Sequence, residues 1–441
     1  MSTPKRRATG PAAPAWTGRP DGPFGEQRIL VYRWDVLQRQ PSDVERELLG
    51  SSYRWALVVA FSAGRPLGAD YVQCSADCAE RLRSLSTSWF RGPVREPSTG
   101  SVPSVSVVVP STFRRRESLR RTLDALLRQT AEPIEIIFVD NRPSEDKADF
   151  LSELSAHERV SVLPCAKMGA AAARNVGLRA AVGEVVAFTD DDAEPDERWV
   201  EEVGRAVVRG NAPPTLLVGL ILPRELESPA QVLMECSGSL AERRYEPYTY
   251  SMATSSPSAS FTGPLVRRFQ VVRSSERDCA QHFVYQTGPF GMSMNMAARK
   301  DVLEALGGFD EMLGTGTPCA GGEDIELVFR AFERGGTLLF WPDGYVWHSG
   351  RASMKELEEQ MRGYGIGLTA ALAALVRQRP IHLAGLVYFS CSLVARRLAG
   401  APPSESSGRF PKDLIRTQRR GRLIGGLVYL QAVARERKQG R

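Results

Sequence analysis

The stretch EVVAFTDDD, residues 184–192, decides the fold, because an apolar run of strand length ends there in three consecutive aspartates. Such a run without alternating polar residues is typical of a strand buried on both faces of a parallel sheet. Three adjacent carboxylates repel one another and cost stability unless a cation neutralises them. The stretch therefore predicts a buried strand that ends at a polar, ligand-facing edge.

Strand and helix patterns alternate on both sides of this stretch. This order predicts an α/β fold with right-handed crossovers and a mostly parallel central sheet covered by helices. In such sheets ligands bind at the carboxyl ends of the strands. The predicted strands are residues 105–109, 134–139, 160–163, 184–189, 290–298 and 337–341, and the predicted helices include residues 147–155, 170–182, 196–209, 299–306, 323–334 and 354–377.

The composition of the 441 residues divides the chain into five parts. A disordered, Pro-, Gly- and Ala-rich N-terminus (1–25) precedes a small accessory module of a β-hairpin and a helix (26–90). A linker (91–104) leads to the α/β domain (105–350), and a basic helical extension follows (351–441). Within the α/β domain, residues 223–287 lack a clear period and are interpreted as an insertion on the acceptor side.

Overall composition narrows the class of protein. A hydrophobic content of 42% allows a large core, and the net charge of +6 suits phosphate-bearing ligands. No nucleic-acid-binding signature accompanies that charge. Seven scattered cysteines favour a reducing compartment, and residues 381–395 are apolar but too short to span a bilayer. With no visible secretory signal, we expect a cytoplasmic protein.

The aspartates suggest a metal site. Alternate residues of an extended segment point the same way, so Asp190 and Asp192 are expected to share a face. Carboxylates together with diphosphate oxygens suit Mg²⁺ or Mn²⁺, and an imidazole from His348 would favour Mn²⁺. The alternatives are an acidic turn that caps the next helix, and a histidine that only packs beside aromatic residues.

Further polar residues stand at the other predicted strand ends and helix starts. Glu323 and Asp324 open a helix after two glycines; they either complement the helix dipole or supply a general base whose pKa burial raises. Asp140 is either a turn residue or a partner of a nucleobase or ribose. Gly169 is interpreted as a close approach to a ligand, and Arg174 as a surface charge or a nucleotide contact.

Taken in order, these motifs resemble those of the family 2 glycosyltransferases. The resemblance covers about residues 103–350, and no dinucleotide-binding GxGxxG or P-loop competes with it. It implies a GT-A nucleotide-sugar-binding fold, mostly with inversion of configuration. The motifs are VSVVVPS (105–111), VDN (139–141), AARNVG (172–177), FTDDD (188–192), PDERW (195–199), GGFD (307–310) and GED (322–324).

The resemblance also implies roles for individual residues. Asp324 would be the general base, with Glu323 beside it. Asp190, Asp192 and His348 would hold a divalent metal, and Asp190 would also face the nucleotide. The other nucleotide-sugar-binding residues would be Pro110, Ser111, Arg114, Asp140, Asn141, Gly169, Arg174 and Asp191.

We therefore predict a metal-dependent, inverting transfer of a sugar from a nucleotide diphosphate to a hydroxyl in cell-envelope polysaccharide or glycoconjugate synthesis. The acceptor would be a glycan, a lipid-linked molecule or a small molecule, and no nucleic acid is expected to bind. Two alternatives are a catalytically silent nucleotide-sugar-binding module and a metal-dependent nucleotidyl- or phosphotransferase. The basic C-terminal tail, with Leu423 and Leu427 among arginines, is either a solvated end or a peripheral contact with the inner face of the membrane.

Overall fold

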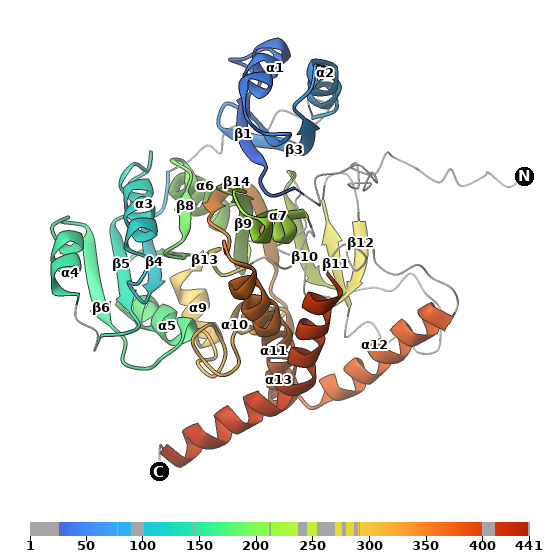
Figure 1. The fold of residues 1–441 in the computed structure, drawn as a ribbon. Coiled ribbons are helices and arrows are strands. Elements are labelled where there is room, and N and C mark those ends of the chain that lie inside the picture. Colours follow the sequence, from blue (N-terminus) through green and yellow to red (C-terminus); the bar gives the residue numbers. More distant parts are fainter. Residues whose placement is uncertain are drawn as a thin grey trace, which may run out of the picture.

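The structure is a computed structural model in which a small N-terminal module, a central sheet with its helices, and three long C-terminal helices follow one another (Figure 1). The predictions for residues 1–25 and for most of the linker lie outside the described residues. Those are 26–76, 78–89, 101–143, 147–210, 213–236, 245–253, 270–275, 279–285, 290, 292–398 and 411–439.

The predicted parallel sheet forms one half of the central sheet. Its strands lie in the spatial order β6-β5-β4-β7, and each pair is parallel. Every residue of β4 and β7 is buried, as their uninterrupted apolar sequences predict. The bounds are β4 Val105–Ser111, β5 Glu135–Asp140, β6 Val160–Pro164 and β7 Val185–Thr189.

Helices cover both faces of this half. The alanines of α5 pack on one face against Val108 and Val139, whereas α3, α4 and α6 fill the other face with leucine, phenylalanine and tryptophan side chains. The α/β class predicted from the alternating pattern is therefore confirmed. The bounds are α3 Arg116–Leu127, α4 Ala148–Ser155, α5 Ala170–Ala180 and α6 Trp199–Val207.

The other half of the sheet contains antiparallel pairs. Strand β13 (Asn295–Arg299) lies antiparallel between β7 and β9 (Leu216–Pro223), and β9 pairs in parallel with β14 (Leu338–His348). Neither β9 nor the full length of β14 is among the predicted strands. Pro342 and Gly344 interrupt the apolar pattern of β14, and a register shift between Trp341 and Val346 accommodates them.

The region 223–287, which lacks a sequence period, is partly regular. Its described residues include α7 (Pro229–Cys236) and three strands that extend the sheet beyond β14 in the order β10-β11-β12. These strands are Tyr248–Met252, Gln270–Ser274 and Cys279–Phe283, and their pairing is antiparallel. They are short and rich in polar residues, which explains why their pattern is weak.

The N-terminal module, residues 26–89, is larger than the predicted hairpin and helix. Strand β1 pairs in parallel with β2, β2 pairs antiparallel with β3, and the helices α1 and α2 pack on the sheet. The sheet's other face joins the main core through residues such as Leu57 and Phe61. The bounds are β1 Leu30–Asp35, α1 Pro41–Gly50, β2 Trp55–Ser62, β3 Arg65–Gln73 and α2 Cys78–Trp89.

The C-terminal part begins with α11 (Met354–Gln378), which lies between α13 (Lys412–Gln439) and the start of α10 (Glu323–Glu333). Glycines allow both contacts, because a Cβ on Gly365 would lie 2.1 Å from the carbonyl oxygen of Gln418, and one on Gly322 would lie 2.3 Å from that of Gly367. Helix α12 (Ile381–Leu398) joins the two. Within the described residues, no helix has the length and apolar character needed to cross a bilayer.

Candidate active site

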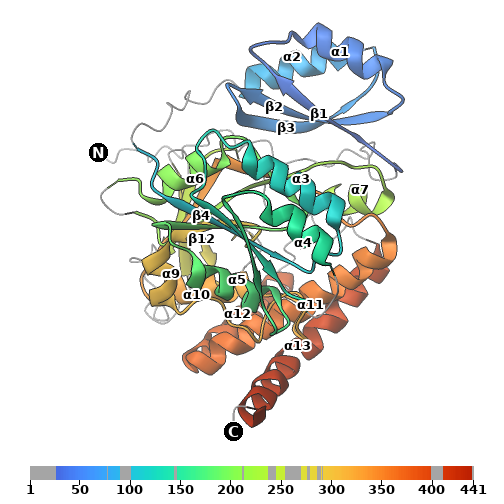
Figure 2. The same ribbon diagram turned by 90° about the vertical axis from the view of Figure 1, so that its left-hand side faces the viewer.

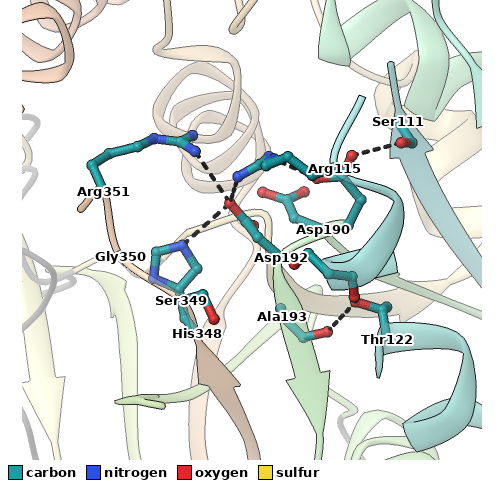
Figure 3. A network of polar contacts seen from close by, with 12 residues as sticks. Ser111, Arg115, Thr122, Asp190, Asp192, Ala193, His348, Ser349, Gly350 and Arg351 are labelled. Atoms are coloured by element: carbon teal, nitrogen blue, oxygen red, sulfur yellow. Dashed lines mark hydrogen bonds and ion pairs between the residues drawn. The ribbon is translucent and has the colours of Figure 1, made fainter. Parts of the chain in front are cut away.

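The three aspartates after β7 form a turn rather than an extended segment. The backbone N–H of Ala193 donates to the carbonyl oxygen of Asp190 (3.2 Å), and β8 (Ala193–Pro195) follows at once. The extended segment expected over these aspartates is therefore not formed, and the turn sets the direction of each side chain. The Asp190 side chain pairs with Arg174. The Asp192 side chain faces His348 (Figure 3).

Strand pairing brings His348 to Asp192. Strand β8 pairs antiparallel with the end of β14, with His348 opposite Ala193. In addition, the backbone N–H of Ser349 donates to the carbonyl oxygen of Asp192 (3.0 Å). As a result, Nε2 of His348 lies 3.7 Å from Oδ2 of Asp192, and both side chains are buried.

Two arginines neutralise the buried carboxylates. Arg115, the residue before α3, pairs with both Asp191 (2.7 Å) and Asp192, and Arg351 lies 3.6 Å from Asp192 (Figure 3). The hydroxyl of Ser111 at the end of β4 donates to Asp191 (2.6 Å). The carboxyl ends of β4 and β7 thus meet, as the strand order predicts.

The neighbouring carboxylates differ in their acidity. Burial raises the pKa of Asp191 to about 6, against the opposing effect of Arg115. Burial acts in the same direction on Asp192, but His348, Arg115 and Arg351 outweigh it and hold the pKa of Asp192 well below its usual range. Asp192 is therefore an anion at any physiological pH, as a cation ligand must be.

Arg174 on α5 is an internal bridge. Its guanidinium group donates to Asp190 (2.8 Å) and to Glu323 (2.9 Å), and its side chain is 2% exposed. It is therefore not a surface charge, and its two hydrogen-bonded partners are protein carboxylates. The bridge ties the aspartate turn to the N-terminus of α10.

Asp324 is held by backbone groups, whereas its neighbour Glu323 pairs with Arg174. Its carboxylate accepts hydrogen bonds from the backbone N–H groups of Ile325 (2.8 Å) and Ser293 (3.4 Å). Burial, and next the charge of Glu323, raise the pKa of Asp324 to about 7. Of the two predicted catalytic acids, Asp324 thus has the acidity of a general base, and Glu323 is engaged by Arg174.

Tyr364 on α11 lies near the site, although it is not among the predicted site residues. It is partly buried, and the charges of Arg351, Asp324 and Asp192 all act on its hydroxyl. Gln360 donates a hydrogen bond to that hydroxyl (3.0 Å), and burial raises the pKa of Tyr364. Which face of α11 carries Tyr364 toward the site depends on the helix bounds, Met354–Gln378, which the sequence pattern alone does not settle.

Three predicted nucleotide-sugar-binding residues have partners within the protein. Lys147 pairs with Asp140 (2.8 Å). The side chain of Asn141 donates to the carbonyl oxygen of Lys167 (2.8 Å) and accepts from the backbone N–H of Gly169 (2.7 Å). A Cβ on Gly169 would lie 2.6 Å from the methyl group of Thr317, so the protein itself approaches this glycine closely.

The remaining two predicted residues flank Ser111 and its loop. Pro110 is buried in β4 opposite Val139, and Arg114 is exposed. The carboxylates are contacted by Arg115 instead of Arg114. The run of three arginines at 114–116 does not reveal which one faces the site, because that depends on where α3 begins.

The donor set suits a divalent ion. No group of three or more His, Cys, Asp or Glu side chains ready to hold a metal occurs in the described part of the chain. The pair Asp192 and His348 nevertheless fits, because two atoms bound to one ion at about 2.1 Å each lie roughly 3–4 Å apart. Diphosphate oxygens would complete such a site, as the prediction from the sequence requires.

Comparison with known proteins relates this fold and site to a family of transferases. Residues 106–213 match Glycosyl transferase family 2. The glycosyltransferase AglE of Haloferax volcanii is 26% identical over 269 residues, 60% of this chain and 73% of that protein. The pre-mycofactocin glycosyltransferase of Mycobacterium tuberculosis is 29% identical over 321 residues, 72% of this chain and 57% of that protein. The match over residues 106–213 bears out the resemblance of this part of the chain to the family 2 glycosyltransferases.

One solved structure covers most of the chain at low identity. The mannosyltransferase PcManGT of Pyrobaculum calidifontis, in complex with GDP-Man and Mn²⁺, aligns with 80% of this chain and 93% of its own, with 18% identity and a TM-score of 0.41.

Proposed function

We propose that this protein transfers a sugar from a nucleotide diphosphate to a hydroxyl acceptor, with inversion of configuration. The observation that supports it most directly is Asp324, a carboxylate with a pKa of about 7 at the N-terminus of α10. The Arg174 bridge links this region to the aspartate turn at the sheet edge. A base and an anion-binding edge are the two parts that a single displacement requires.

In the proposed reaction Asp324 takes the proton of the acceptor hydroxyl, whose oxygen then bonds to the anomeric carbon as the bond to the diphosphate breaks. Asp192 and His348 would hold a divalent metal, Mn²⁺ or Mg²⁺, which when bound stabilises the charge of the leaving diphosphate. Arg115 and Arg351 already contact Asp192 and would turn toward the phosphates. Ser111, Asp191 and Asp190 would line the donor pocket.

Turnover with a panel of nucleotide-sugars tests this proposal. The assay measures nucleoside diphosphate released with Mn²⁺, with Mg²⁺ and with a chelator, and the anomeric proton of the product shows inversion or retention. Asp324→Asn is expected to lose transfer. Release of pyrophosphate would favour a nucleotidyltransferase instead, and donor binding without any turnover would favour a silent binding module.

A peripheral position at the inner face of the membrane is part of the proposal as well. Its support is the basic C-terminal part of the chain, where exposed leucines such as Leu423 and Leu427 stand among arginines.

A further inference from the structure

Helix α12 presents apolar side chains to solvent along one stripe. Leu383, Val387, Val394 and Leu398 are 59%, 56%, 57% and 85% exposed. Their spacing of four, seven and four residues places them on one face of the helix. Exposed apolar patches of this kind mark interaction surfaces.

The opposite face of α12 is fixed to the protein. His382 accepts or donates a hydrogen bond with the Tyr285 hydroxyl (3.0 Å) and lies 3.0 Å from Glu333. Further along, the Phe389 ring contacts the rings of Phe283 and Tyr285 at tilted angles. The stripe is therefore held outward by a docked helix, and the exposure of its side chains follows from that docking.

A second stripe lies on α13. Leu423, Leu427 and Leu430 are 85%, 60% and 52% exposed and follow one another at helical spacing. Arg416 and Arg420 continue the same line toward the N-terminus of the helix, and both are exposed. Two views show α12 and α13 at the end of the molecule opposite the N-terminal module (Figures 1 and 2).

Charge identifies the occupant of this surface. Helix α12 contains no carboxylate, and its last turn carries Arg396 and Arg397. A second copy docked symmetrically here would bring two arginine-rich surfaces together, which is unfavourable. An anionic bilayer surface matches both features, because apolar side chains enter the headgroup boundary while arginines contact lipid phosphates.

We propose that the outward stripe of α12 is a membrane-docking surface that lies in the interface of an anionic bilayer, and that the leucine stripe of α13 is a second contact with that bilayer. The apolar part of α12 is thus an interfacial helix, which accounts for a run too short to span. This inference deepens the peripheral membrane position proposed above and rests on it. It does not depend on the sugar transfer itself, because the surface is made by other residues.

Flotation of the full chain with vesicles tests the surface. Vesicles of phosphatidylcholine and phosphatidylglycerol in equal parts are expected to carry the protein, and phosphatidylcholine alone much less. Leu383→Glu and Leu427→Glu are each expected to weaken binding about tenfold or more, because a carboxylate replaces an inserted leucine and is repelled by the lipid. Leu37→Glu, at a leucine that is 63% exposed in the N-terminal module, is the matched control and is expected to bind as wild type.

A second readout follows insertion directly. Cys391 lies on α12 and is exposed. The other cysteines whose side chains the structure describes are buried or partly buried. An environment-sensitive fluorophore on Cys391 is expected to shift to the blue on anionic vesicles. Wild-type protein that stays in solution, or equal binding by Leu383→Glu and wild type, would overturn the proposal. So would a wild-type dimer that Leu383→Glu converts to a monomer without any vesicle binding. Diphosphate release measured without vesicles separates this result from a failure of the proposed activity.

Discussion

Nε2 of His348 lies 3.7 Å from Oδ2 of Asp192, because the last residue of β14 is paired with the first residue of β8. The contact joins two segments that are far apart in the sequence. It places an imidazole and a carboxylate of very low pKa at one edge of the sheet. The proposed metal site therefore requires the pairing of β14 with β8, which brings the two side chains together, as well as the side chains themselves.

Asp192→Asn is expected to reduce metal-dependent transfer by about a hundredfold or more, because it removes the charge that would hold the ion. The measurement is diphosphate release as a function of Mn²⁺ concentration, in which the variant should also need more metal. Asp301→Asn, at a surface carboxylate whose side chain is 64% exposed, is the control and should match wild type. Unchanged metal dependence in Asp192→Asn would exclude Asp192 as a ligand.

The pKa of about 7 for Asp324 predicts a pH profile. A general base works only when deprotonated, so kcat/KM should rise as the pH increases through about 7 and level off above it. Asp191, with a pKa of about 6, is the competing explanation for such a rise. An Asp191→Asn variant that keeps the rise near 7 assigns it to Asp324, whereas a profile that becomes flat assigns it to Asp191.

Arg174→Ala is expected to destabilise the fold by about 3–5 kcal/mol, because it leaves Asp190 and Glu323 without their buried partner. Denaturant unfolding measures this. The control is Arg299→Ala, whose pair with Asp301 is 37% and 64% exposed and should contribute less than about 1 kcal/mol. Similar losses of unfolding free energy in the two variants would show that the buried bridge stabilises the fold no more than an exposed ion pair does.

Much of this arrangement follows from the sequence, and the reasons for the rest are physical. The apolar strands and the polar residues at their ends predict the parallel half of the sheet and the meeting of Ser111 with the aspartate turn. Side-chain direction inside that turn is set by the hydrogen bond to Asp190 and by the pairing of β8, which no periodicity reports. Sequence periodicity likewise does not show that Arg115 pairs with the aspartates, because its direction depends on where α3 begins.

Long-range pairing explains the other differences. Strand β14 contains Pro342 and Gly344, which locally argue against a strand, and only its neighbours β9 and β8 stabilise its full length. The role of Gly169 depends on Thr317, which approaches it from a distant loop. Partners of this kind are visible once the fold brings them together.

Gly322, the residue before the proposed catalytic acids, predicts a coupling between α11 and the proposed base. Gly322 has a φ of +90°, and a Cβ there would lie 2.3 Å from the carbonyl oxygen of Gly367. Gly322→Ala should therefore cost both backbone strain and a clash, together about 2–4 kcal/mol, and should lower kcat. Gly335→Ala has a similar φ of +76° but nothing within 4 Å, so it reports the strain alone. Equal losses in the two variants would show that α11 does not press on this loop.

Asp324 also predicts an opposition between activity and stability. Its pKa is raised from 3.8 to about 7, so the folded protein holds a proton that the unfolded chain releases at lower pH. Between about pH 4 and pH 7 the unfolded state therefore binds fewer protons, and stability falls as the pH rises. Asparagine cannot ionise, so it removes this cost while it abolishes the base.

Asp324→Asn is thus expected to be inactive and yet more stable than wild type, by about 1–3 kcal/mol near pH 8 and by almost nothing near pH 4. Urea unfolding at both pH values measures the difference. For Asp301→Asn the sign is reversed, because Arg299 holds the pKa of Asp301 below its usual range and the variant should gain nothing at high pH. A destabilised Asp324→Asn at both pH values would mean that the carboxylate is charged and well stabilised in the folded protein. In that case its hydrogen bonds with Ile325 and Ser293 would outweigh its burial, and a base with a pKa near neutrality would have to be sought elsewhere in the site.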